Sequence, residues 1–245
     1  MKNLKKIWAH HSVLSVIESY PHLVNEVYFH KDFNESLRLK SIQHLAEENG
    51  ITTKTVARFP AEIQEKRHQG TWAVIKKFPT IIFKDFIKNK SNWENENYLM
   101  LSGIEDPRNF GAILRSAAAF NINGVIIPNK FQAPLNGVVA QSSAGQIFKN
   151  NIITSDHLKN VLEFTNQKEF ISARLEVSGT KLREFLTQNS SYKGPKFWIL
   201  GSEGRGVDNR IKPFINHKVE IPISSDIDSL NVSVAAGILC YELNS

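Results

Sequence analysis

The sequence predicts an α/β protein built from a small N-terminal part and a larger C-terminal part. Strand-like apolar segments alternate with helix-like segments through most of the 245 residues, which is typical of a mostly parallel sheet covered on both faces. A polar stretch at 84–96 separates two such regions. Basic residues are in excess only before it, with 15 Lys and Arg against 10 Asp and Glu up to Asn95 and 15 against 14 afterwards. We therefore expect domains at 1–83 and 97–245, joined by a linker at 84–96.

The first domain is expected to be a compact α/β module. A helical pattern covers 11–20 and a short strand 27–29. A second helix covers 35–49 and stops at Gly50, the residue type expected at a helix end. Two further strands, at 51–58 and 69–75, complete the module.

The second domain continues the alternation of strands and helices. Its expected strands are 98–102, 124–127, 169–173, 197–200 and 217–220, and its expected helices lie near 108–120, 135–143, 155–167, 180–188 and 231–243. This order predicts a mostly parallel sheet with helices on both faces. Because connections in proteins almost never thread loops, the pattern by itself predicts no knot.

Composition narrows the classes of function. The net charge of +6 suggests a polyanionic partner such as nucleic acid, although a solvated basic surface without a partner stays an alternative. No apolar run approaches the ~20 residues of a membrane span, and the Lys-rich start lacks a secretory signal's apolar stretch. Cys240 is the only cysteine, so no intrachain disulfide forms, and a cytoplasmic location is expected. The eight histidines show no metal-like spacing, and no metal is expected.

The most informative segment lies near the C-terminus. Ser229-Leu230-Asn231-Val232-Ser233 leads directly into an apolar helix. One hydroxyl or amide suffices to cap a helix start, but here there are three. Gly237 inside the helix costs about 0.5–1 kcal/mol relative to Ala, which suggests close packing there. The segment is a candidate functional site.

A second segment places a large cation among small side chains. Asp106-Pro107 is a strong helix start. On the helix that follows, Arg115 shares its face with Gly111, Ala112, Ala118 and Ala119. The free space around its guanidinium suits an anion or substrate site. Alternatively, Arg115 extends across an apolar patch to water.

A third segment is a glycine-rich loop after an apolar strand. The strand at 197–200 continues into Gly201-Ser202-Glu203-Gly204-Arg205-Gly206. Glycines at this point allow the backbone to approach a ligand closely, although a tight turn would need them too. Their order differs from those of dinucleotide-binding folds and phosphate-binding P-loops, which disfavours a dinucleotide-dependent oxidoreductase.

Together and in this order, the three segments resemble the SpoU/TrmH family of RNA ribose 2′-O-methyltransferases, in the SPOUT superfamily. The pattern Asn-x-Gly-x-x-x-Arg-x-Ala starts at Asn109, Gly-Ser-Glu-Gly-x-Gly starts at Gly201, and Ser-Leu-Asn-Val-Ser starts at Ser229. A looser match involves 133–135 and 143–145. The resemblance covers 97–245 and implies a SPOUT-type α/β domain with a deep C-terminal trefoil knot. It also implies S-adenosylmethionine as cofactor and a homodimer formed through this domain.

The N-terminal part resembles the substrate-binding domain of the branch that methylates a guanosine of 23S rRNA. The resemblance rests on residues 10–14, His-His-Ser-Val-Leu, and on His68-Gln69-Gly70, although Ala9 replaces the usual Gly before the first His. It implies a small, L30e-like RNA-binding domain.

The resemblance also implies a set of site residues. The reactive cluster would be Asn109, Arg115, Glu203, Ser229 and Asn231, and the cofactor would contact Gly201, Ser202, Gly204, Ile221, Ile223, Ser225 and Leu230. Ser225 departs from the family pattern, which has Gly there. Arg115 is proposed in the family to activate the 2′-hydroxyl, but a guanidinium hardly ever loses its proton, so we expect an electrostatic role. RNA phosphates would be bound by Arg108, Arg205, His68, Lys76 and Lys77, for each of which plain surface solvation stays an alternative.

Two alternatives remain open for the function. The first is a tRNA guanosine as substrate: the separate N-terminal module favours rRNA, but the basic charge would suit either RNA. A catalytically inactive RNA-binding or ribosome-assembly protein could retain the fold, and Ser225 leaves room for that interpretation.

Overall fold

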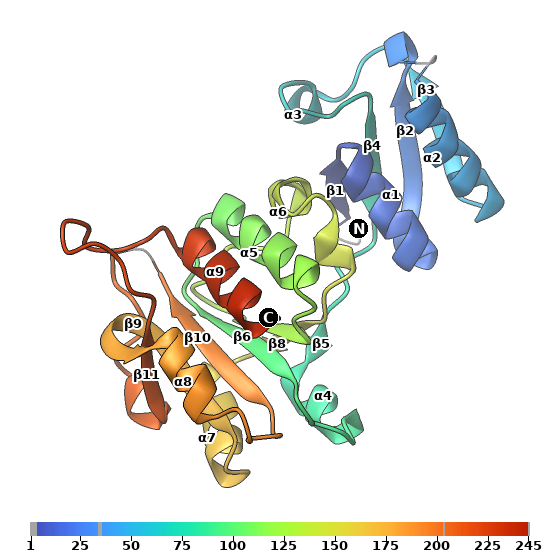
Figure 1. Ribbon diagram of the computed structural model, residues 1–245. Coiled ribbons are helices and arrows are strands. Elements are labelled where there is room, and N and C mark those ends of the chain that lie inside the picture. Colours follow the sequence, from blue (N-terminus) through green and yellow to red (C-terminus); the bar gives the residue numbers. More distant parts are fainter. Residues whose placement is uncertain (1–3, 34–35, 203, 245) are drawn as a thin grey trace. The chain divides into compact units, whose positions relative to one another are not determined.

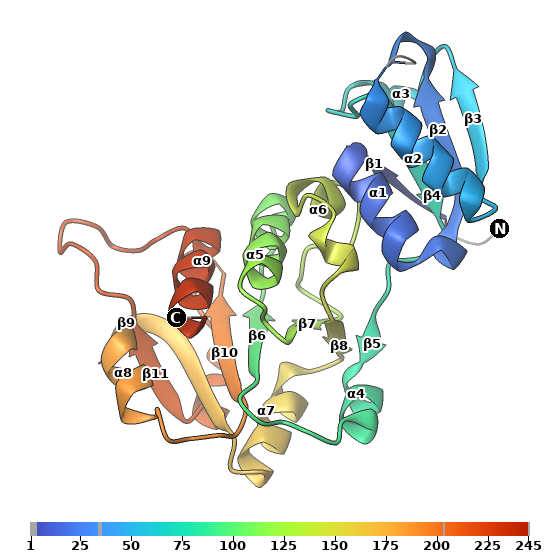
Figure 2. The same ribbon diagram turned by 45° about the vertical axis from the view of Figure 1, so that its right-hand side comes forward.

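The computed structural model describes residues 4–33, 36–202 and 204–244, and the chain forms two compact units. The N-terminal unit comprises residues 1–79 and 134–149. The C-terminal unit comprises residues 80–133 and 150–245. The elements of both units are drawn in Figures 1 and 2. Among the described residues, no helix is long and apolar enough to cross a membrane.

The N-terminal unit contains a four-stranded mixed sheet. The order is β1-β4-β2-β3, with β2 and β3 parallel and the other pairs antiparallel. Its strands are β1 (Lys5–Trp8), β2 (Val24–His30), β3 (Thr52–Val56) and β4 (Thr71–Ile75), and its helices are α1 (His10–Ser19), α2 (Leu37–Glu48), α3 (Ala61–Gln64) and α6 (Gly137–Ser142). The predicted α/β character of this part is confirmed, whereas β1 and α3 were not predicted.

Helix α6 belongs to the N-terminal unit because it packs on Trp8. A Cβ atom at Gly137 would lie 2.0 Å from the Trp8 ring, so only glycine allows this approach. Val138 packs against the same cluster, which includes Trp8 and Trp72. Farther along the segment, the Ser15 hydroxyl donates a hydrogen bond to the Gly145 carbonyl (2.9 Å). These contacts attach residues 134–149 to the N-terminal unit.

The C-terminal unit is built on a seven-stranded sheet in which every pairing is parallel, as the alternation of elements predicts. The order is β11-β9-β10-β6-β7-β8-β5. The central strand β6 contains Tyr98, Leu99, Met100 and Leu101, all fully buried, because helices cover both of its faces. The strands are β5 (Ile81–Ile82), β6 (Asn97–Ser102), β7 (Gly124–Pro128), β8 (Ile152–Ser155), β9 (Ile171–Lys181), β10 (Lys196–Gly201) and β11 (His217–Glu220).

Five helices surround this sheet: α4 (Phe83–Asn89), α5 (Pro107–Ala119), α7 (Leu158–Gln167), α8 (Leu182–Gln188) and α9 (Val232–Leu243). Phe83 of α4 and Val161 of α7 join the core cluster that contains Tyr98 and Phe197. Helices α5 and α9 lie side by side in both ribbon views (Figures 1 and 2). A Cβ atom at Gly237 would be 3.5 Å from the Ser116 hydroxyl, an ordinary contact. Among the residues that the structure describes, the close packing expected at Gly237 is therefore not found.

Several elements differ from the sequence-based expectation. The segment expected to be a linker, 84–96, includes most of α4, and Trp93 packs against the core with its ring 5.9 Å from that of Tyr98. Strands β5 and β8, of two and four residues, are too short to show a periodic pattern. Strand β9 continues to Lys181, well beyond the expected 169–173.

Candidate active site

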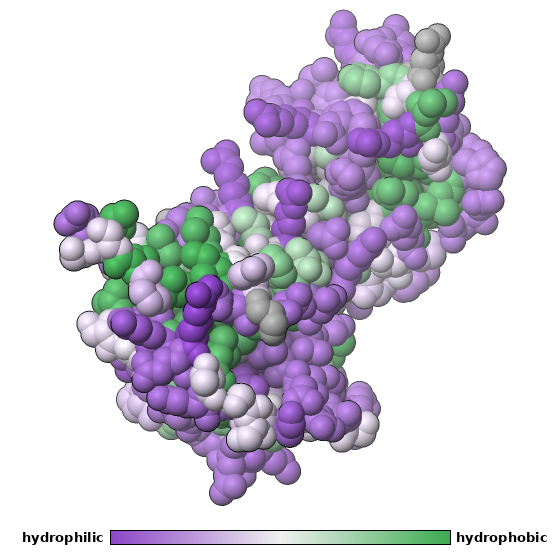
Figure 3. Space-filling model, viewed as in Figure 1, coloured by the Kyte–Doolittle hydropathy of each residue, from purple (hydrophilic) through white to green (hydrophobic). Residues whose placement is uncertain are grey.

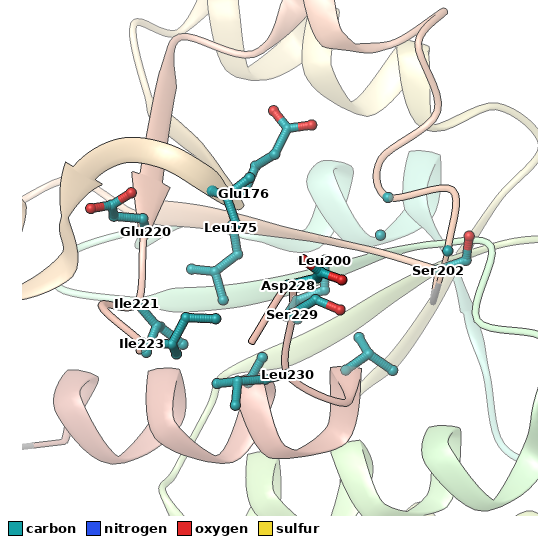
Figure 4. Close-up of a pocket in the computed structure, with 16 residues that line it drawn as sticks. Leu175, Glu176, Leu200, Ser202, Glu220, Ile221, Ile223, Asp228, Ser229 and Leu230 are labelled. Atoms are coloured by element: carbon teal, nitrogen blue, oxygen red, sulfur yellow. The ribbon is translucent and has the colours of Figure 1, made fainter. Parts of the chain in front are cut away.

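The candidate site lies where the carboxyl ends of β9, β10 and β11 meet the start of α9. Parallel strands bring their carboxyl ends to one edge of a sheet, where ligands of open α/β folds bind. A cavity of about 290 Å³ opens there (Figure 4), lined by residues of β9, the loop after β10, the segment after β11 and the first turn of α9. Its volume is near the lower end for small-molecule sites, about 300 Å³.

The walls of this first cavity are mainly apolar. Leu175 of β9 points toward Ile221 and Ile223, which follow β11, and Leu230 lies close to α9 (Figure 4). Glu176, the next residue of the strand, points the opposite way, as alternation along a strand requires. An apolar slot of this kind suits a flat aromatic group, such as adenine.

The loop after β10 folds back on itself at the edge of the cavity. Ser202 and Gly206 exchange two backbone hydrogen bonds of 3.1 and 2.9 Å. A Cβ atom at Gly201 would be 2.0 Å from the Gly206 backbone, so the turn requires glycine there. Gly204 has φ +81°, and a Cβ atom there would meet nothing within 4 Å. The loop thus leaves backbone exposed beside open space, as contact with a ligand requires.

Three carboxylate residues belong to the described wall of the cavity: Glu176, Glu220 and Asp228. Glu176 accepts hydrogen bonds from Lys212 Nζ (2.6 Å) and Arg174 Nε (2.9 Å). Burial alone would raise the pKa of Glu176, but these two cations outweigh it and lower that pKa. Glu220 accepts a hydrogen bond from the Gly179 amide (3.1 Å). Since Glu176 is paired with cations and points away from Leu175, it is the other two of these carboxylates, Glu220 and Asp228, that favour a ligand with positive charge.

A second cavity, of about 340 Å³, adjoins the first. Ser202 and Val232 line both cavities, so the two share a wall. The second is otherwise lined by Gly103, Ile104, Glu105 and Asp106, which lie between β6 and α5, and by Asn109 and Arg205.

A hydrogen bond joins the C-terminal segment that contains Asn231 to the segment that contains Asn109. Asn231 caps α9 by accepting from the Ser233 amide (2.9 Å) and the Ser233 hydroxyl (2.6 Å). Its Nδ2 donates to Asn109 Oδ1 (3.2 Å). Asn109 lies in the first turn of α5, which Asp106 caps by accepting from the Arg108 amide (2.7 Å). The helix caps thus bring together residues that are 122 positions apart in sequence.

Most of the residues expected to contact the cofactor line the first cavity: Gly201, Ser202, Gly204, Ile221, Ile223 and Leu230. Ser229, expected in the reactive cluster, lines it too. Ser225 is exposed and does not line it, and its backbone is not in the left-handed region, so serine causes no strain there. Glu203 lies outside the described residues.

Arg115 is placed differently from the rest of the expected cluster. It is exposed on α5 and lines neither cavity. Within the described part of the chain, its side chain forms no hydrogen bond or ion pair. Arg108 is also exposed on α5, and Arg205 is exposed at the second cavity.

The other residues expected to bind RNA belong to the N-terminal unit. Lys76 and Lys77 are exposed, and Lys76 Nζ donates to the His22 carbonyl (2.6 Å). His68 is half-buried, with its ring 4.8 Å from that of Phe59. Burial, and secondarily the nearby His30, lower the pKa of His68. Its imidazole is therefore neutral at pH 7 and offers a ring and hydrogen-bonding atoms rather than a charge.

Sequence reasoning missed part of the first cavity. Leu175, Glu176 and Val177 lie in the distal half of β9, and Glu220 and Asp228 flank the segment after β11. The signal for the strand was present, because residues 174–178 alternate between polar and apolar types. No local pattern distinguishes the two carboxylates from other exposed acidic residues.

Comparison of the sequence with known proteins identifies the family of this chain. The model of the SpoU rRNA Methylase family matches residues 96–241. A 23S rRNA (guanosine-2′-O-)-methyltransferase, RlmB of Acinetobacter baylyi, is 32% identical over 236 residues, covering 95% of this chain and 93% of that protein. The chain belongs to the SpoU rRNA methylase family.

Solved structures of SpoU methyltransferases share the fold. AviRb from Streptomyces viridochromogenes has a TM-score of 0.79 at 17% identity, covering 98% of this chain and 88% of AviRb. The same protein in complex with the cofactor AdoMet (S-adenosylmethionine) has a TM-score of 0.76 at 18% identity, covering 98% and 89%. Another relative, a Staphylococcus saprophyticus protein assigned to the TrmH family of tRNA/rRNA methyltransferases, is 29% identical and covers 95% of this chain and 92% of that protein.

Membership confirms the family and the class of enzyme expected from the three sequence segments. This SpoU family member is an RNA methyltransferase, and the family uses S-adenosylmethionine as methyl donor. The predicted parallel α/β fold is confirmed as well. Among the described residues, no group of three or more His, Cys, Asp or Glu side chains could hold a metal ion.

Proposed function

We propose that this SpoU family member methylates the 2′-hydroxyl of a guanosine ribose in 23S rRNA. The observation that carries the proposal is the shared wall of the two cavities. A methyl donor in the first cavity and a ribose in the second would meet at Ser202 and Val232, next to Asn109. The choice of guanosine and of 23S rRNA is supported by the 32% identity to RlmB.

The residues of the first cavity fit S-adenosylmethionine. Its adenine would contact Leu175, Ile221, Ile223 and Leu230, and the backbone at Gly204 would approach it without obstruction. Its positive charges would be balanced by Glu220 and Asp228. When bound, the cofactor supplies an electrophilic methyl group.

The polar residues around the second cavity would position the acceptor. Asn109, held by Asn231, and Ser202 would orient the ribose, and orientation of reactants accounts for a large part of such catalysis. Arg115 lies six residues beyond Asn109, about 9 Å along the helix axis. It would bind the neighbouring phosphate and stabilise the developing alkoxide. Glu203, the phosphate and water are the three candidates for accepting the proton.

The rest of the chain would bind the RNA and complete the assembly. We assign RNA binding to an L30e-like domain at 1–83 and the reaction to a knotted SPOUT domain at 97–245 in a cytoplasmic enzyme, with 84–96 between them. Homodimerisation through α9 is supported by its exposed apolar side chains, including Val234 (50% exposed) and Tyr241 (57% exposed). Figure 3 shows hydrophobic side chains gathered over this helix.

A tRNA guanosine is the second candidate substrate. The Staphylococcus saprophyticus relative, at 29% identity, is assigned to the TrmH family as a tRNA/rRNA methyltransferase, a name that includes tRNA. The basic N-terminal part suits either RNA. A protein that kept the fold but lost the reaction is the remaining alternative.

The test is methyl transfer onto RNA from a strain that lacks the gene. Purified protein is incubated with S-adenosylmethionine carrying a deuterated methyl group and with 23S rRNA or total tRNA, and the nucleosides are analysed by mass spectrometry. We expect 2′-O-methylguanosine at one position of 23S rRNA. Labelled tRNA alone would select the second candidate, a labelled base would refute ribose methylation, and no label in any RNA would indicate an inactive protein.

A further inference from the structure

An exposed aromatic residue lies in the loop whose backbone packs on the wall of the second cavity. Phe131 follows β7 and is 75% exposed. Its backbone has φ +59°, in the left-handed region that bulky residues rarely adopt. A single exposed apolar residue needs no explanation, but a strained one is kept only where its surroundings hold it.

The surroundings of Phe131 fix its backbone to the cavity wall. The Ala133 amide donates to the Ile104 carbonyl (2.8 Å), and the Ile104 amide donates to Gln132 Oε1 (3.1 Å). The Phe131 carbonyl oxygen lies close to Gly103: it is 3.6 Å from the place that a Cβ atom would occupy if residue 103 had one. Gly103 and Ile104 are both part of the second cavity's wall.

The other end of this loop is anchored to β8 and the residue after it. The Asn129 amide donates to the Ser155 carbonyl (2.9 Å), and Asn129 Nδ2 donates to Asp156 Oδ1 (2.7 Å). Phe131 is thus presented to solvent by a loop that is held at both ends. Little conformational entropy is lost when a ligand covers such a preorganised group.

The chemistry around Phe131 favours RNA as the ligand. Lys130 is exposed next to it, and the adjoining cavity contains Arg205 and Asn109. Single-stranded nucleic acids are bound by aromatic rings that stack on bases, combined with cations that contact the phosphates. Among the described residues between Ile82 and Val177, no other large apolar side chain is exposed. Within this part of the chain, Phe131 is thus a lone exposed apolar side chain and is accompanied by a cation.

We propose that Phe131 stacks on a nucleobase of the RNA whose ribose enters the second cavity. This inference rests on the proposed function for the identity of the ligand and adds a base-contacting residue to it. The stacked base lies outside the cavity, so the contact contributes to RNA binding and leaves binding of S-adenosylmethionine unaffected.

Three variants of the full chain separate stacking from plain apolar contact: Phe131→Ala, Phe131→Leu and Phe131→Trp. Affinity for an unmodified 23S rRNA transcript and for tRNA is measured by filter binding, and affinity for S-adenosylmethionine by calorimetry. We expect Ala and Leu to weaken binding of the RNA substrate about 5- to 150-fold, the loss for one stacked base. The Trp variant should bind like the wild type, and RNA should quench its added fluorescence. Calorimetry should give one cofactor affinity for all four proteins.

Two outcomes would overturn the proposal. One is that Phe131→Ala binds RNA as tightly as the wild type does. The other is that light scattering gives Phe131→Ala a different molecular mass from the wild type, which would show that Phe131 forms a protein–protein contact. Failure of the proposed reaction gives a different result. If the variants lose RNA affinity and the wild type methylates no ribose in any RNA, the stacking contact is supported and the proposed reaction is refuted. If the wild type methylates ribose and Phe131→Ala does so equally well, the reaction stands and the contact falls.

Discussion

Arg115 is the residue on which the proposed chemistry depends most, although it lies outside both cavities. We predict that Arg115→Ala lowers turnover by about 10²–10³-fold or more, the loss for removing one electrostatic stabiliser of a transition state. Because the side chain is exposed and has no polar partner among the described residues, the affinity for S-adenosylmethionine and the melting temperature should not change. Single-turnover methyl transfer, calorimetry and thermal unfolding measure the three quantities.

Arg108→Ala is the matched control, since Arg108 is exposed on the same helix. It should retain the chemical step and at most raise KM for RNA. Near-normal turnover in Arg115→Ala would remove the residue from the mechanism.

Cys240 gives a prediction that is independent of the chemistry. It is fully buried, and burial raises the pKa of its thiol to about 12. Since the thiolate is the reactive form, the native protein should not react with a thiol reagent at pH 8 and should react fully in denaturant. Rapid labelling of the native protein at Cys240 would show that α9 is not packed as described.

At the level of single residues, the family resemblance pointed to some residues that the fold brings together. Asn109 and Asn231 stand at helix starts, and they are hydrogen-bonded to each other. Glu220 and Asp228 escaped prediction, because an acidic residue in a polar segment is usually solvated. Only the fold places them beside a cavity.

Asn231, at the start of α9, both caps the helix and contacts Asn109, and substitutions can separate these two roles. Asn231→Ala removes the cap and should lower the free energy of unfolding by about 0.5–2 kcal/mol. Asn231→Ser keeps a capping oxygen, but its side chain is too short to reach Asn109. This variant should therefore be nearly as stable as the wild type, while its turnover should be lower than that of the wild type. Urea unfolding and methyl transfer measure the two effects. Full turnover in the Ser variant would mean that the contact with Asn109 has no catalytic value.

Glu176 of β9 forms ion pairs with cations of the same strand, of the turn before β11 and of β11 itself, and this predicts a pH dependence. Arg174, Lys212 and Lys218 lie within 4.0 Å of its carboxylate. Because its pKa is lowered in the folded state, the stabilisation is present above the ordinary value of 4.5 and is lost as the pH falls below it. Glu176→Gln should lower the free energy of unfolding by about 1–2 kcal/mol at pH 7, a loss between those for surface and buried ion pairs.

The cost of Glu176→Gln should shrink toward zero as the pH falls below 4.5, where the wild-type carboxyl becomes protonated. Urea unfolding of the two proteins at a series of pH values gives this difference. A cost that is constant with pH would show that packing at residue 176, and not charge, stabilises this edge of the sheet.

Among the elements, a clear start or end in the sequence mattered more for prediction than length, since β8 and β11 both have four residues and only β11 was predicted. Helix α5 and strand β11 have clear ends in the sequence, with Asp106-Pro107 before the helix. Strand β5 has two residues, and pairing with β8 defines it rather than any local pattern. The polar composition of 84–96 suggested a linker, but the apolar face of α4 and Trp93 packs on the core.

At the level of the whole molecule, the exposed face of α9 tests the proposed homodimer. Val234→Arg should convert a dimer into a monomer, since it places a charge in the interface. Ile82→Arg is the control. Ile82 is 60% exposed, similar to Val234 at 50%, but it lies in β5 and not in α9. Sedimentation measures the mass of both variants. A monomeric wild type, or a Val234→Arg dimer as stable as the wild type, would refute dimerisation through α9.

Alternation of elements was enough to predict a parallel α/β sheet, but not the division of the chain into two compact units. Residues 134–149 follow β7 in sequence and belong to the N-terminal unit. Their attachment depends on Trp8 fitting against Gly137, a contact between residues 129 positions apart that no local pattern reveals. Likewise, the trefoil knot was expected solely from the family resemblance, since general rules of chain topology disfavour knots.

The most direct test of the central claim is a crystal structure of the protein with S-adenosylhomocysteine. If the two cavities are the donor and acceptor sites, the adenine will lie among Leu175, Ile221, Ile223 and Leu230, and the sulfur will face the shared wall at Ser202. A ligand bound anywhere else, or bound with its sulfur turned away from Asn109, would contradict the account.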